Sequence, residues 1–217
     1  MPIAKYKDRM AERYILSTLP TLFISGKRDW QGGTFLSDDG RGYVCTPTGV
    51  RWTQNGYLFD GTDDIITCPT LLSAVTQFTV FSWFRRSAMT GDKGIWGINS
   101  TPNRLWCFSS PPSNIYCNIS NGVLSTARFL YTLLANSWYC LAWTFDGTQP
   151  TDATKVKAYI GTSYATLSQQ TLIFEDAAQP TSTADNTGQN FLLGRQPAIA
   201  GTFLPGNIGV FLLYPSP

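Results

Sequence analysis

The chain has 217 residues, of which 43% are hydrophobic and 14% aromatic, enough to build the core of one large all-β domain. Only 14% of the residues are charged and the formal net charge is +2, too small to indicate a nucleic-acid partner. The chain contains no histidine, which excludes mixed cysteine/histidine zinc sites and catalytic pairs of a nucleophile with histidine.

Residues 1–18 are predicted to form an arm that is separate from the domain that follows, because their apolar residues recur irregularly between charges. Six basic residues stand against two acidic ones in residues 1–28, so this end of the chain is basic. Such a stretch is either a solvated end or a contact surface. In the second case the contact residues are Lys5, Tyr6, Lys7, Arg9, Arg13 and Tyr14.

Neither a secretory signal nor a membrane span is evident, since every apolar run is too short or is interrupted. We therefore expect the chain to fold in a cytoplasm and to have no membrane partner.

From residue 19 to residue 217 the sequence predicts one sandwich of short antiparallel strands. The first strand is expected at Leu22–Ile24. Asn55-Gly56 is a strong two-residue hairpin signal, and it joins predicted strands at Val50–Trp52 and Tyr57–Phe59.

Four later segments alternate as strands do. Residues 78–84 and 138–145 are apolar on both faces, which predicts central strands that are covered on both sides. Residues 155–160 alternate between polar and apolar side chains, as in a half-exposed strand. Residues 207–214 are the last predicted strand. Its expected buried face carries Ile208, Val210 and Leu212.

The five cysteines form no metal-binding spacing. They are Cys45, Cys68, Cys107, Cys117 and Cys140. Cys107 and Cys117 flank Pro111-Pro112-Ser113 symmetrically, so a hairpin there would place them face to face. They would then be either a disulfide or, as we favour, two buried free thiols.

Several segments together carry a family resemblance. They are Phe59-Asp60-Gly61-Thr62, Phe78 to Trp83, Trp138 to Gly147, Val156 to Gly161 and Leu192-Leu193-Gly194-Arg195. In their order and in their residues these segments resemble the concanavalin A-like, laminin-G-type family, over about residues 22–214. The resemblance implies an antiparallel two-sheet jelly-roll sandwich. It leaves the function open, because this fold serves lectins, glycosidases and structural modules.

An enzyme is not expected. Retaining glycosidases need two carboxylates about 5 Å apart, and in the resembling family these lie on one strand face. The only glutamates are Glu12 and Glu175, and neither has an acidic residue two positions away. The adjacent pairs Asp38/Asp39 and Asp63/Asp64 would point to opposite faces of a strand.

Calcium is the one cofactor that the resemblance suggests. In the family, the acid matched by Asp60 often joins an acid in the last strand, but the matching position here resembles Gly209. The alternative is that Asp60 caps a turn through its own backbone.

A sugar-binding platform would need exposed aromatic rings beside amides. The aromatic candidates are Trp96, Trp106 and Tyr116, and the amide candidates are Asn99, Asn103, Asn114 and Asn118. The alternative is that these aromatic residues belong to the core.

Similar stand-alone domains occur in tailed bacteriophages, which favours a virion structural protein: a capsid decoration, head-fibre or tail-associated module. In this interpretation the chain assembles in the host cytoplasm, forms a homo-oligomer such as a trimer, and contacts other virion proteins of the capsid or tail through its arm. The alternative is a lectin-like module for host-surface glycans, and a glycosidase is the least favoured reading.

Overall fold

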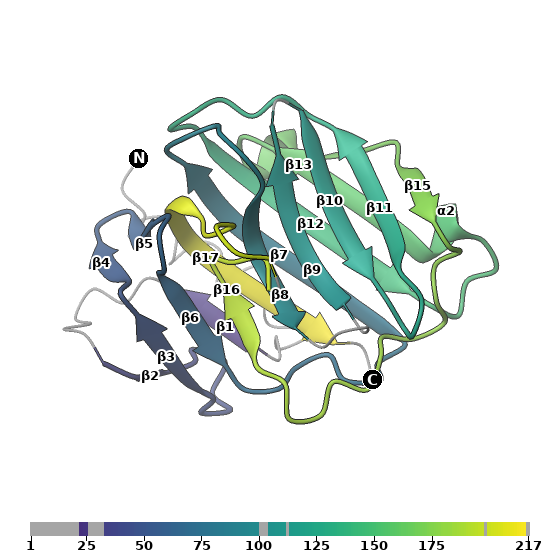
Figure 1. The fold of residues 1–217 in the computed structure, drawn as a ribbon, viewed down its shortest axis with the longest axis horizontal. Coiled ribbons are helices and arrows are strands. Elements are labelled where there is room, and N and C mark those ends of the chain that lie inside the picture. Colours follow the sequence, from purple (N-terminus) through teal and green to yellow (C-terminus); the bar gives the residue numbers. More distant parts are fainter. Residues whose placement is uncertain (1–21, 26–32, 100–103, 112, 198, 216–217) are drawn as a thin grey trace.

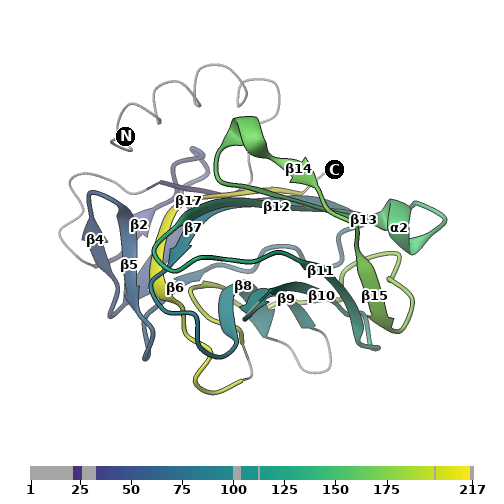
Figure 2. The same cartoon turned by 90° about the horizontal axis from the view of Figure 1, so that it is seen from above.

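The computed structural model describes residues 22–25, 33–99, 104–111, 113–197 and 199–215. Two antiparallel sheets lie face to face and form a jelly-roll sandwich, as the sequence predicts (Figures 1 and 2). Helix is confined in these residues to α2 (Asp152–Lys155) and the 3-10 turn η1 (Tyr164–Thr166). No helix in these ranges has the length and apolarity that a membrane crossing requires.

The first sheet has eight strands among the described residues. Their order is β14 (Ser168–Gln169), β13 (Val156–Gly161), β12 (Trp138–Asp146), β7 (Gln77–Arg86), β17 (Pro205–Pro215), β5 (Gly56–Asp60) and β4 (Arg51–Thr53). The eighth strand, β1 (Leu22–Ser25), also pairs with β17.

The second sheet has nine strands in the described part of the chain. Their order is β15 (Ile173–Asp176), β11 (Ser125–Leu130), β10 (Asn114–Ile119), β9 (Arg104–Ser110), β8 (Lys93–Asn99), β16 (Phe191–Leu193), β6 (Ile65–Cys68), β3 (Val44–Thr48) and β2 (Phe35–Leu36).

The core lies between the two sheets. The central strand β7 turns Phe78, Val80 and Phe84 into this core, as the alternating pattern predicts. Its opposite face carries Phe81, which is buried in a second, smaller apolar cluster with Cys140 and other side chains. The prediction that residues 78–84 form a central strand with apolar side chains buried on both faces is therefore confirmed.

The last strand departs from the predicted face. A bulge at Gly209 interrupts the pairing of β17 with β7, between Ile208 and Val210. An extra residue in one strand exchanges the faces of all residues beyond it. Ile208 therefore faces the main core, but Phe211 and Leu213 follow it there, while Val210 and Leu212 join the second cluster. The predicted Ile208, Val210, Leu212 face was wrong for this reason.

Two predicted hairpins are present. Thr53 pairs with Gly56, so the two-residue turn is Gln54-Asn55, one position before the predicted Asn55-Gly56 turn. Gly56 is the first residue of β5 and has φ +92°, a conformation that glycine adopts without strain. In the hairpin of β9 and β10, Cys107 lies opposite Cys117 in register. Both are buried free thiols, as favoured from the sequence.

Candidate functional site

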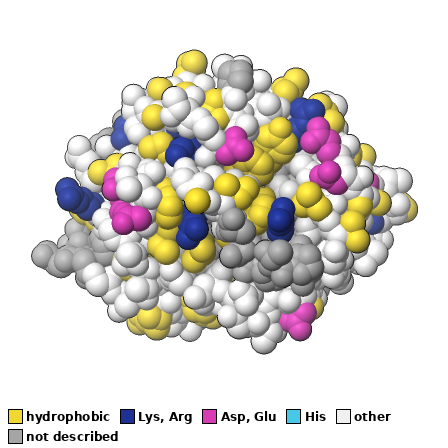
Figure 3. All heavy atoms as spheres, in the orientation of Figure 1, with side chains coloured by type: hydrophobic (Ala, Val, Ile, Leu, Met, Phe, Trp, Pro, Cys, Tyr) yellow, Lys and Arg dark blue, Asp and Glu magenta, His cyan; other side chains and the backbone are white. Residues whose placement is uncertain are grey.

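The outer face of the nine-stranded sheet carries a row of four side chains over strands β9, β10, β11 and β15. Phe108 pairs with Tyr116, Tyr116 with Arg128, and Arg128 with Ile173. The residues that alternate with them, such as Cys107, Cys117 and Ala127, belong to the core. The row therefore lies on the side of the sheet away from the core, which is the face seen in Figures 1 and 3.

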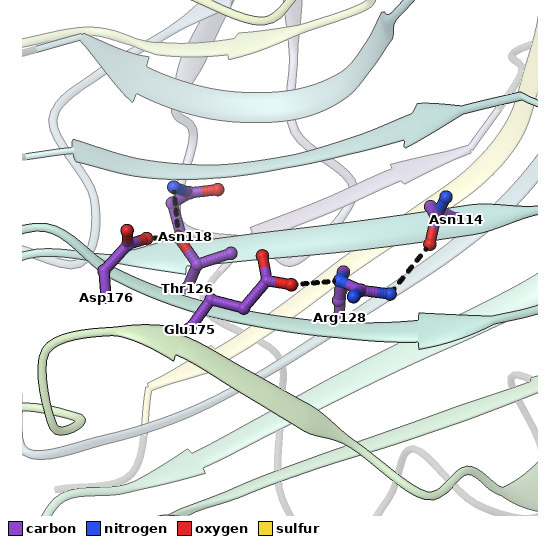
Figure 4. Close-up of polar contacts among 6 residues, drawn as sticks. All are labelled: Asn114, Asn118, Thr126, Arg128, Glu175 and Asp176. Carbon is purple, nitrogen blue, oxygen red and sulfur yellow. Dashed lines mark hydrogen bonds and ion pairs between the residues drawn. The ribbon is translucent and has the colours of Figure 1, made fainter.

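An ion pair crosses this face. Arg128 Nε lies 2.6 Å from Glu175 Oε1, and Arg128 Nη1 donates a 3.1 Å hydrogen bond to Asn114 Oδ1 (Figure 4). The three side chains come from β11, β15 and β10, so three rigid strands set the direction of the guanidinium. Both charged side chains are partly exposed, and they still present polar edges to solvent.

The aromatic part of the face is Tyr116, whose ring stacks on Phe108 with centroids 4.6 Å apart and planes 3° apart. Tyr116 is half-buried, whereas Phe108 is nearly covered. The exposed Leu130 and Ile173 flank the ion pair. Figure 3 shows hydrophobic side chains beside basic and acidic ones on this side of the molecule.

We call this surface the sheet-face patch. It consists of Phe108, Asn114, Tyr116, Arg128, Leu130, Ile173 and Glu175.

A second polar chain lies one row along the same strands. Asn118 Nδ2 donates to Thr126 Oγ1 at 3.1 Å, and Thr126 Oγ1 donates to Asp176 Oδ2 at 2.7 Å (Figure 4). Asn118 is almost completely buried. This hydrogen-bonded chain lies beside the ion pair and also joins β10, β11 and β15, so it helps to hold the three strands of the patch together.

The structure corrects the predicted platform at Trp96. Its side chain is fully buried, belongs to the core and stacks on Phe191. A platform needs an exposed ring face, so Trp96 cannot supply one.

Trp106 is on the outer face but is also covered, with 2% of its surface exposed. The Arg104 guanidinium lies 5.1 Å from its ring centroid. A Cβ on Gly97 would meet both Trp106 Cβ and Pro197 Cδ, so the loop before β17 packs closely beside the indole. Trp106 therefore offers no stacking surface either.

Of the other predicted platform residues, Tyr116 and Asn114 lie in the patch, and Asn118 lies buried in the next row. Asn103 and the side chain of Asn99 lie outside the described residues.

Neither Arg128 nor Glu175 was identified as a binding residue from the sequence. The structure places Glu175 in the edge strand β15, opposite Thr126. Alternation in residues 125–130 could have indicated that Arg128 faces outward from a strand. The partner strand, however, lies 47 positions away in sequence, and no local pattern links the two.

The predicted calcium ligand Asp60 lies in a small acidic group. Carboxylate oxygens of Asp60, Asp63 and Asp64 are within 4.8 Å of one another. Asp64 Oδ2 accepts a hydrogen bond from the Asp60 N–H, and burial raises the pKa of Asp64. Asp60 Oδ1 accepts from the Thr62 N–H at 2.7 Å, which is the turn-capping alternative.

The second ligand position implied by the resemblance is not beside Asp60. Gly209 packs against Gly56, at the opposite end of β5. Calcium binding by Asp60 stays a prediction, and Asp63 and Asp64 are the acids that the fold places near it.

No family model matches the chain, and no curated protein matches it. Among solved structures, the binding domain of botulinum neurotoxin DC in complex with SialylT aligns with a TM-score of 0.63 and 10% identity. The alignment covers 93% of this chain but only 49% of the toxin domain, so the chain spans about half of that domain.

Two further structures are similar. Domain 4 of AbnA, an extracellular arabinanase from Geobacillus stearothermophilus, in complex with arabinotriose, aligns with a TM-score of 0.53 and 19% identity, covering 89% of this chain and 81% of that one. The Ruminococcus gnavus IT-sialidase CBM40 aligns with a TM-score of 0.50 and 12% identity, covering 66% and 78%.

At these identities the likeness shows the fold alone, a jelly-roll sandwich. The similar structures are carbohydrate-binding or receptor-binding domains and not catalytic domains.

Proposed function

We propose that the protein binds carbohydrate through the sheet-face patch, without cleaving it. The observation that carries the proposal is the half-buried Tyr116 ring beside Arg128, Glu175 and Asn114, whose polar groups are held in one orientation by their mutual bonds. An aromatic face packs against the C–H side of a sugar ring, and fixed donors and acceptors recognise its hydroxyls.

The rigidity of the patch supports this proposal. Its polar side chains stand on three paired strands, so little side-chain entropy remains to be lost on binding. The arabinotriose and SialylT complexes of proteins with a similar fold also support it. These findings favour the lectin-like alternative over the virion role, which stays a prediction.

The test is a glycan array followed by titration calorimetry with wild-type protein and Tyr116→Ala. The array should include arabino-oligosaccharides and sialylated glycans. We expect saturable binding that weakens about tenfold or more in Tyr116→Ala, because loss of a central aromatic contact typically costs more than about 1 kcal/mol.

The matched control is Tyr159→Ala, which removes a half-buried tyrosine from β13 in the other sheet. Equal binding by Tyr116→Ala and wild-type protein would contradict the proposed site. Catalytic release of shorter sugars by the protein would instead support the glycosidase hypothesis.

A further inference from the structure

Two buried polar atoms, one on β9 and one on β10, lie next to the sheet-face patch without a hydrogen-bond partner among the described residues. Trp106 on β9 is the register partner of Asn118 on β10. Trp106 Nε1 and Asn118 Oδ1 have no hydrogen-bond partner in the described part of the chain, and only 2% and 6% of these residues' surfaces are exposed to solvent. Buried polar atoms are nearly always bonded, so each such atom calls for an explanation.

The Asn118 amide is oriented by the bond that it does make. Its Nδ2 donates to Thr126 on β11, and its Oδ1 points along the strands without a bond to the residues drawn (Figure 4). Strand β9 lies on the other side of β10 from β11. The unused acceptor of Asn118 and the unused donor of Trp106 therefore belong to side chains that are neighbours on the outer face of the sheet.

The two atoms have complementary requirements. The indole N–H can only donate a hydrogen bond, and the amide oxygen can only accept one. A hydroxyl group does both, whereas a carboxylate would repel the amide oxygen and a cation would leave the indole N–H unbonded. Ser120, two positions beyond Asn118, adds a third buried polar atom without a partner, its Oγ.

We propose that Trp106 and Asn118 form a hydroxyl-binding position of the carbohydrate site. This inference rests on the proposed function and names the ligand chemistry: an uncharged sugar unit whose hydroxyl accepts from Trp106 Nε1 and donates to Asn118 Oδ1. Tyr116 and Asn118 are two positions apart on β10, about 7 Å, so a sugar chain stacked on Tyr116 extends to this position.

Arg104 controls access to the position. Its guanidinium lies over the Trp106 ring, and its side chain is half-buried at the surface. A long cationic side chain keeps its charged end in water when it moves aside. In the proposed complex the ligand approaches the Trp106 ring from the side of Arg104, which moves aside without opening the core.

The experiment records the indole N–H signals of the full chain by ¹H–¹⁵N NMR during titration with arabinotriose and, separately, with sialyllactose. Trp106→Phe assigns the Trp106 signal and removes its donor together with part of the buried ring, a loss of volume that Trp96→Phe shares. Trp96→Phe is the matched control, because Trp96 Nε1 is also buried and unpartnered but lies in the core.

We expect the Trp106 signal to shift on titration and the Trp96 signal to stay in place. Trp106→Phe and Asn118→Leu should each bind at least about fivefold more weakly, the effect of one lost hydrogen bond, while Trp96→Phe binds as the wild type does. Thermal unfolding of each variant, followed in parallel, separates loss of the contact from loss of the fold.

The outcomes distinguish the two proposals. Binding that needs Tyr116 but is unchanged in Trp106→Phe and Asn118→Leu overturns the hydroxyl position and leaves the proposed function standing. Weaker binding without any shift of the Trp106 signal also overturns it, because the contact is then indirect. Absence of saccharide binding by the wild-type chain overturns both.

Discussion

At the scale of single residues, Arg86 is a buried side chain held by several hydrogen bonds. It is 1% exposed, and its guanidinium donates to the carbonyl oxygens of Ala88, Thr90 and Gly91 and to both oxygens of Ser109. Burial lowers the pKa of Arg86 to about 10, so the group stays charged at neutral pH. Arg86 thus ties the turn after β7 to strand β9.

We expect Arg86→Leu to lower the free energy of unfolding by about 3 kcal/mol, because several buried carbonyl groups lose their donor. Urea denaturation followed by tryptophan fluorescence measures this. Arg51→Ala, at an exposed position of β4, is the control and should change stability by less than about 0.5 kcal/mol. Equal stabilities of the two variants would show that the guanidinium network is dispensable.

Asp146 makes stability depend on pH. Its carboxylate accepts hydrogen bonds from the Thr148 hydroxyl and from the amides of Gln149 and Gln77. These bonds lower its pKa below the ordinary value of 3.8, the Thr148 hydroxyl most of all. A depressed pKa contributes stability that is fully present above 3.8 and is lost as the pH falls toward the folded-state pKa.

The expected result is that Asp146→Asn loses less stability than the wild type when the pH is lowered from about 5 to about 2.5. Urea midpoints at a series of pH values provide the measurement, with the exposed Asp63→Asn as control. An identical pH profile for wild type and Asp146→Asn would mean that other carboxylates dominate the acid response.

At the scale of elements, the loop before β17 packs closely against strand β8 and covers the outer face beside Trp106. A Cβ on Gly94 would lie 1.7 Å from the backbone nitrogen of Gln196, so only glycine fits there. The Gly94 N–H also donates to the Thr202 carbonyl, which holds the loop on the strand. The packing of this loop against β8 thus depends on Gly94, a residue without a side chain.

We expect Gly94→Ala to destabilise the protein by about 2 kcal/mol or more, because the added methyl group meets backbone that cannot move aside. Gly209→Ala is the graded control, since its Cβ would meet the Trp83 ring at 3.0 Å and a side chain adjusts more easily. Thermal unfolding ranks the two variants, and the reverse order would contradict the role of the loop.

At the scale of the whole molecule, the jelly roll supplies a rigid sheet but does not itself select a ligand. The sheet-face patch occupies one outer face, and the predicted contact residues of the arm lie outside the described residues. Proposed binding by the patch and proposed assembly through the arm involve different residues, so they can be tested separately.

Assembly through residues 1–18 predicts that the full chain is an oligomer and that a chain starting at Leu19 is a monomer. Light scattering of both proteins gives their masses in solution. The truncated protein should still bind sugar, since the patch lies in the sandwich. If the full and the truncated chain form the same oligomer, so that their masses differ only by the deleted residues, the arm is not needed for assembly.

Local patterns in the sequence predicted several strands and some of their contacts. The hairpin of residues 51–60, apart from a one-residue shift of its turn, the two apolar faces of residues 78–84 and the opposition of Cys107 to Cys117 follow from periodicity and turn chemistry. These features depend on residues that are close together in the chain, so the sequence carries their full description.

Only the tertiary structure decided which aromatic rings are exposed and which charges meet. The sequence around Trp96 and Trp106 does not show which ring faces inward. In the structure Trp96 faces the core, whereas Trp106 lies beneath Arg104 on the outer face. The Arg128–Glu175 pair joins strands that come together through long-range pairing. Local patterns therefore indicated the central strands and the family resemblance indicated the jelly roll. The proposed binding surface depends instead on bulges and long-range register, because a single-residue shift exchanges the faces of a strand.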